Sequence, residues 1–221
     1  MRHLAQPRVL LLAVAAALVT SLACHLRLAH WLNRPDPVWL LESVIFLCGI
    51  VLWGFVFAWH TPYTGRPVFA LKIAPQLFAA VTLAGVVVAA MYHLLLDPAL
   101  RLKIPEDYPA DLKQWLAVVL FSLTFNQLFF VFAPFAWLVR LFHNVRVATI
   151  LTVLFGAVVL ALKIHSTFTP ISPLLFAVFL IGRIIAGFLA VLIYLRGGLL
   201  LSWWWTLLIE ARHLSDLAGH S

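Results

Sequence analysis

The sequence predicts an all-α fold, a polytopic transmembrane helical bundle. Hydrophobic residues make up 64% of the 221 residues and charged residues only 10%. A soluble domain carries about a quarter charged residues, so this chain could not cover its surface against water. Its apolar stretches run for roughly 16 to 23 residues, the length that crosses a hydrocarbon core as a helix. We therefore expect one integral-membrane domain over residues 1–221.

The apolar stretches predict six full spans and a short seventh helix. The first stretch follows Arg2 and Arg8 and is similar to a secretory signal, but we interpret it as a span. The run 199–209 is too short to cross alone, so it either continues as a helix through Glu210 and His213 or lies partly inserted. The six full spans are predicted at residues 9–26, 38–59, 74–96, 115–137, 147–162 and 173–195.

The charges favour contact with lipid headgroups and exclude nucleic-acid binding. The formal charge is +7, but the basic residues are scattered singly or in pairs between apolar segments, with no cluster that could follow a run of phosphates. Lysines and arginines divide equally between the two sides, so they do not fix the orientation. Nearly all acids fall opposite the N-terminus, and we favour a cytoplasmic N-terminus. Cys24 and Cys48 lie in apolar segments and imply no disulfide framework.

Polar residues at membrane depth are the strongest functional signal. Arg183 lies near the middle of the predicted span 173–195, and Asn126 and Gln127 lie midway along 115–137. A charge at that depth costs about 2.5 kcal/mol or more, so it should face the protein interior and have a partner. Either these groups hold helices together by hydrogen bonds, or they form a ligand-binding site. Glu42 and Glu210 are the acids that could neutralise Arg183 internally.

A second set of residues lies near the end of the chain. Glu210 and His213 are three residues apart, a spacing that places a carboxylate and an imidazole on one helix face, and Asp216 extends that row. We interpret this segment as an interfacial helix end. The alternative is a metal site formed by Glu210, His213 and His165.

The second half of the chain, residues 114–217, resembles the CPBP family of CAAX-processing and bacteriocin-immunity-type intramembrane metalloproteases. Three motifs carry the resemblance, in the order and spacing of that family. They are Asn126-Gln127-Leu128-Phe129-Phe130, Phe155-Gly156, and Phe179 to Gly182 followed by Tyr194-Leu195-Arg196-Gly197-Gly198. The resemblance implies a CPBP-like core at 114–217, preceded by N-terminal spans and a polar loop at 1–113.

The catalytic residues that the resemblance implies are missing. Asn126 and Gln127 stand in place of two glutamates, Val131 in place of an arginine, and Val159 and Leu207 in place of the two histidines. Amides cannot ionise, so they can position a ligand but cannot act as a general base. We therefore expect no catalytic residues, no metal and no cofactor.

These observations lead to one preferred function and two alternatives. The preferred hypothesis is an inactive, CPBP-like protein of the bacterial inner membrane that binds a lipid or isoprenoid-type ligand, or a membrane protein partner. Asn126, Gln127 and Arg183 would form its binding site. The first alternative is a divergent metal-dependent endopeptidase. The second is a structural subunit of a larger membrane complex.

Overall fold

The protein is an all-α bundle of long apolar helices, as the sequence predicts. The structure is a computed structural model that describes residues 4–30, 36–101, 108–166 and 172–218, without the side chains of residues 164–166, 216 and 218. In these ranges six helices are long and apolar enough to cross a membrane, which confirms a multi-pass membrane protein. They are Pro7–His30, Val38–Thr64, Pro75–Leu100, Leu112–Phe142, Val145–Lys163 and Pro173–His213.

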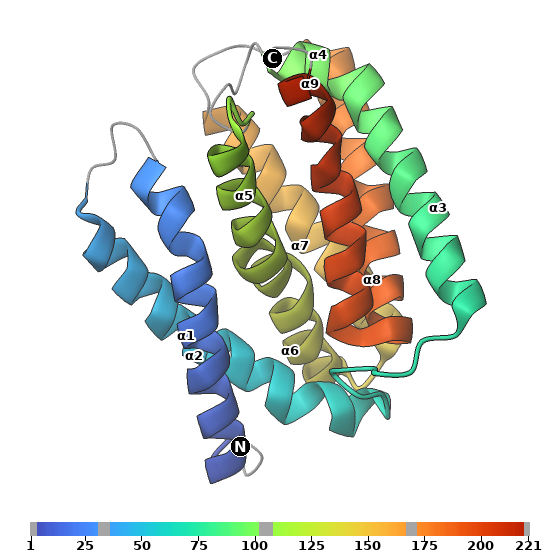
Figure 1. Ribbon diagram of the computed structural model, residues 1–221. Helices are drawn as coiled ribbons and strands as arrows, with labels where there is room; N and C mark the ends of the chain where they lie inside the picture. Colours follow the sequence, from blue (N-terminus) through green and yellow to red (C-terminus); the bar gives the residue numbers. More distant parts are fainter. Residues whose placement is uncertain (1–3, 31–35, 102–107, 167–171, 219–221) are drawn as a thin grey trace.

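The first two helices form a close pair on one side of the bundle (Figure 1). α1 (Pro7–His30) and α2 (Val38–Thr64) touch where a Cβ atom on Gly49 would lie 3.1 Å from that of Ala17. The indole of Trp53 donates a hydrogen bond of 2.9 Å to the Thr20 hydroxyl. A small residue and an interhelical hydrogen bond are the usual means by which membrane helices pack, because lipid provides little hydrophobic drive.

The third and fourth membrane helices contain π-helical turns. The third consists of α3 (Pro75–Met91), the π turn η1 (Tyr92–Leu96) and α4 (Asp97–Leu100). The fourth consists of α5 (Leu112–Phe121), the π turns η3 (Ser122–Asn126) and η4 (Leu128–Phe132), and α6 (Ala133–Phe142). Pro134 follows η4, where the backbone already departs from the α-helical hydrogen-bond pattern, so the helix continues through the proline.

α8 (Pro173–Glu210) follows α7 (Val145–Ser166) and folds back on itself as a helical hairpin. The turn of this hairpin is at Gly198, whose backbone is not helical (φ 62°, ψ −161°), and the last apolar run forms its second arm. Figure 1 shows α8 turning back at one end of the bundle. We call the segment after Gly198 the return arm. It continues through a 3₁₀ turn (Ala211–His213) into α9 (Leu214–Ala218), so the first of the two predicted arrangements for residues 199–209 is correct.

The hairpin turn is held by an extended segment. Leu199 donates its backbone N–H to the carbonyl of Val68 at 2.9 Å, and Arg66 donates to the carbonyl of Leu195 at 2.7 Å. A Cβ atom on Gly198 would lie 2.5 Å from the Val68 oxygen, so only glycine allows this approach. The reversal brings the return arm alongside the other helices of the bundle.

The two chain termini lie at opposite ends of the bundle, which we call the N-terminal end and the C-terminal end (Figure 1). We expect cysteines introduced at Arg146, near the N-terminal end, and at Asp111, near the C-terminal end, to react with impermeant maleimide from opposite sides of the membrane. Both residues are exposed, and Cys24 and Cys48 would first be replaced by serine. Labelling of both new cysteines from one side would contradict this topology.

Candidate functional site

A cavity of about 470 Å³ lies among the helices of the second half of the chain. Its walls come from α5 and the π turns that follow it, from α7, from both arms of α8 and from the end of the third membrane helix, and Arg27 of α1 and Tyr108 also line it. This volume is within the roughly 300–1,000 Å³ of ordinary ligand sites. The lining combines apolar side chains with charged and amide groups, a composition suited to an amphiphilic ligand.

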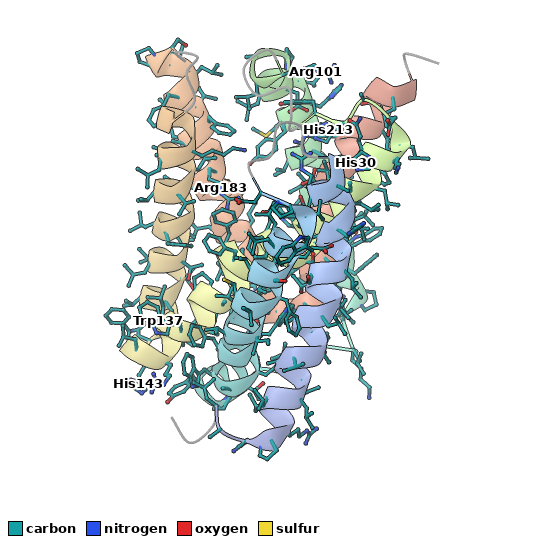
Figure 2. All side chains as sticks on the ribbon, turned by 90° about the vertical axis from the view of Figure 1, so that its left-hand side faces the viewer. His30, Arg101, Trp137, His143, Arg183 and His213 are labelled. Atoms are coloured by element: carbon teal, nitrogen blue, oxygen red, sulfur yellow. The ribbon has the colours of Figure 1, made fainter. Side chains whose placement is uncertain are left out.

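Arg183 forms part of the cavity wall at membrane depth. It lies between α7 and the helices on the other side of the bundle (Figure 2). Its guanidinium carbon is 5.0 Å from the ring centre of Phe130, a cation–π contact. A Cβ atom on Gly156 would be 3.3 Å from a guanidinium nitrogen, so this glycine provides the space that the arginine occupies against α7. The Phe155-Gly156 motif therefore has a local physical role.

No carboxylate in the described part of the chain lies within ion-pair distance of Arg183. The two acids considered as internal partners contact other groups. Glu42 bonds His25, and Glu210 lies 3.6 Å from Arg212. A charge at membrane depth is costly when it has no partner, so this guanidinium is the least compensated charged group that we identify in the cavity wall.

Asn126, Gln127 and Arg183, which the sequence predicts to lie at one depth, all line this cavity. Gln127 Nε2 donates a 2.7 Å hydrogen bond to the Thr206 hydroxyl oxygen, and that hydroxyl donates to the Ser202 carbonyl. This direction of donation fixes the amide orientation, because the Thr206 proton is already used. Gln127 Oε1 remains buried without a donor among the described residues.

A charged network lies at the C-terminal end of the cavity. Asp97, only 4% exposed, accepts hydrogen bonds from Arg212 Nε at 3.1 Å and from the Tyr108 hydroxyl at 2.9 Å. Arg212 also lies near Glu210, so both acids that line the cavity are in contact with one arginine. The indole of Trp115 bonds the Glu210 backbone oxygen at 2.9 Å. These contacts join the third membrane helix, the loop before α5, and the return arm.

The weaker metal-site alternative has limited geometric support. Glu210 and His213 both line the cavity, with a carboxylate oxygen 3.8 Å from the imidazole Nε2. His165 lies in the last turn of α7, but its side chain is outside the described part, as is that of Asp216. Within the described residues, no group of three or more histidine, cysteine or acidic side chains could hold a metal ion.

Two features of the cavity were missed by sequence reasoning. Each π turn contributes to its wall, through Tyr92 and Leu96, Ser122 and Asn126, and Phe130. Such turns occur frequently at functional sites, because one extra residue redirects the side chains around it. Asp97 comes directly after the predicted span 74–96, where a polar loop was expected, yet it begins α4 and is buried. An acid directly after an apolar span was the only signal of its role.

Comparisons with known proteins add no relative: no family model, no curated protein and no solved structure matches this chain. The positions that carry the CPBP resemblance fall partly on the cavity. Asn126, Gln127, Val131 and Gly156 line it, whereas the two expected histidine positions, Val159 and Leu207, do not. Thr206, next to Leu207, does so.

Proposed function

We propose that the protein is a membrane-embedded binding protein whose cavity holds an amphiphile by its anionic group. The observation that carries this proposal is Arg183, a cavity-lining guanidinium with no carboxylate partner in the described chain. A guanidinium presents a planar set of donors suited to phosphate or carboxylate oxygens. An anion at this position would compensate a charge that is otherwise expensive at membrane depth.

The remaining wall supports the amphiphilic part of the proposal. Val131, Val153 and Val191 provide apolar surface, and Asn126 and Gln127 provide amides in the same cavity as the charge. The ligand therefore has an alkyl or isoprenoid-type portion and a polar head, or it is the carboxylate-bearing segment of a membrane partner. The CPBP resemblance supports the same location, because its motif positions Asn126, Gln127 and Gly156 all border this cavity.

The side chains at the motif positions support binding without hydrolysis. Activation of water needs a base that can accept a proton or a set of ligands that can hold a metal. As amides, Asn126 and Gln127 cannot act as the base and are weaker metal ligands than the two glutamates they replace, and Val131 adds only apolar surface. We therefore propose that a protease-like scaffold of the bacterial inner membrane serves here as a receptor for a lipid-like molecule.

The test is the identity of the lipids that co-purify with the protein. We expect Arg183→Met to lose a bound anionic amphiphile that the unmodified protein retains through detergent purification, measured by lipid extraction and mass spectrometry. Lys113→Met, at an exposed residue, is the control and should keep the ligand. Because no carboxylate is left unpaired by removing Arg183, the melting temperature should change little. Identical extracts from all three proteins would refute the proposal.

A second variant tests the position of the charge rather than its presence. We expect Gly156→Leu to displace the Arg183 guanidinium, because even a Cβ atom would come within 3.3 Å of it. Affinity for the extracted ligand should fall by about tenfold, the equivalent of 1.4 kcal/mol, while the arginine remains, measured by native mass spectrometry. Gly182→Ala is a suitable control, since its Cβ atom would meet only Tyr92, at 3.8 Å. Full affinity in Gly156→Leu would separate ligand binding from Arg183.

A further inference from the structure

The N-terminal end of the bundle is basic and contains no acid among its described residues. The chain segments that meet there are residues 4–8, 60–74, 140–148 and 195–199, and none of them contains aspartate or glutamate. In these segments all the lysines and arginines are exposed except Arg140, which is partly exposed. These residues are Arg8, Arg66, Lys72, Arg140, Arg146 and Arg196.

Two arginines are brought together at the turn of the helical hairpin. Arg66 Nη1 donates to the carbonyl oxygen of Leu195 at 2.7 Å, and Arg196 is the next residue along the chain. A third arginine, Arg140, is held with its guanidinium carbon 4.5 Å from the ring centre of Trp59. The protein thus fixes several cations at one end, with no carboxylate in those segments to compensate them.

The C-terminal end differs because its charges compensate one another. Arg212 contacts Asp97 and Glu210, and Glu42 bonds His25. All eight acidic residues of the sequence lie outside the N-terminal segments. The uncompensated positive charge is therefore a property of one end of the molecule and not of the whole surface.

The segment that joins α2 to α3 adds an apolar component to the basic end. Phe69 is 45% exposed and Leu71 is 84% exposed, between the basic residues Arg66 and Lys72. Trp137 is also exposed and lies near His143 at this end (Figure 2). Exposed aromatic and aliphatic groups beside cations are typical of the boundary between acyl chains and headgroups.

We infer that the N-terminal end binds anionic phospholipid headgroups, with the Arg66–Arg196 pair as the centre of the contact. Arginine forks match phosphate oxygens, and Phe69 and Leu71 insert among the acyl chains beneath them. Polybasic segments at a membrane surface gain roughly fivefold in affinity for anionic lipid with each basic residue. This site lies outside the cavity, so it does not depend on the proposed ligand of Arg183.

The test compares two exposed lysines, each close to the start of a membrane helix. Native mass spectrometry would count lipids bound from detergent containing equal amounts of phosphatidylglycerol and phosphatidylcholine, at a salt concentration of about 0.15 M. We expect Lys72→Gln to lower the phosphatidylglycerol affinity roughly fivefold, and Lys72→Gln with Arg146→Gln to lower it further. Lys113→Gln, at the C-terminal end, should have no effect. Phosphatidylcholine binding should be the same in all variants.

One further double variant completes the test. Arg66→Gln with Arg196→Gln should give the largest loss of phosphatidylglycerol. Equal loss of both lipids in the Lys72 variants, or no preference for phosphatidylglycerol in the unmodified protein, would overturn the inference. The latter result would instead favour an acidic protein as the partner of this end. Neither outcome bears on the cavity, whose test is the Arg183 variant with its own ligand.

Discussion

Gly198→Ala is expected to prevent the bundle from reaching its native fold. Gly198 has φ 62° and ψ −161°, a backbone region that is open almost only to glycine and costs other residues about 1–3 kcal/mol. The added Cβ atom would also lie 2.5 Å from the Val68 carbonyl oxygen, and that backbone is held by its hydrogen bond to Leu199. We expect the free energy of unfolding to fall by about 3 kcal/mol or more, a large part of the stability of a typical domain.

The measurement is the fraction of monodisperse protein after detergent extraction, together with the melting temperature. Gly65→Ala separates the backbone strain from the steric clash, because Gly65 has φ 67° but a Cβ atom added there would meet nothing within 4 Å. The free energy of unfolding of Gly65→Ala should fall by only about 1 kcal/mol, the cost of the left-handed conformation for a residue with a Cβ atom. A Gly198→Ala protein as stable as Gly65→Ala would mean that the hairpin turn does not require glycine.

The spans could be predicted because the backbone must satisfy its hydrogen bonds inside the bilayer, which makes each long apolar run a helix. The predicted ends of the spans were less accurate than their number. The first helix covers Pro7–His30 where residues 9–26 were predicted, because the flanking polar residues continue the helix beyond the apolar run. The π turns could not be predicted, since hydrophobic pattern reports which side chains meet lipid and carries no information on a shift of hydrogen-bond partner.

The polar part of the cavity could be predicted in part. Arg183, Asn126 and Gln127 would be costly where their side chains meet lipid, so the sequence predicts that they face the interior, and all three line the cavity. The role of Gly156 beside Arg183 could not be predicted, because it depends on the distance between two helices. The ion pair of Asp97 with Arg212 could not be predicted either. The two residues lie far apart in the chain, and each has other charged residues as sequence neighbours that could equally be its partners.

That ion pair gives the second large expected effect. Asp97 and Arg212 have side chains only 5% and 15% exposed, and they join the third membrane helix to the end of the return arm. Removing one partner of a buried pair leaves an uncompensated charge and costs about 3–5 kcal/mol. We therefore expect Arg212→Met to lower the melting temperature by several degrees, since Asp97 would keep its Tyr108 hydrogen bond but lose the guanidinium, leaving only His93 at 3.9 Å.

The double variant Asp97→Asn with Arg212→Met is the decisive control. It removes both charges of the Asp97–Arg212 pair, and replacing a buried pair by uncharged groups is often nearly neutral. Glu210 loses its contact with Arg212 in both variants, so that loss does not affect the comparison. The asparagine side chain would still accept the Tyr108 hydroxyl through its amide oxygen, so the hydrogen bond survives. The double variant should recover most of the stability lost in Arg212→Met. If it were no more stable than Arg212→Met, the arginine would stabilise the bundle by packing against Tyr92, 5.6 Å from its guanidinium carbon, rather than by neutralising Asp97.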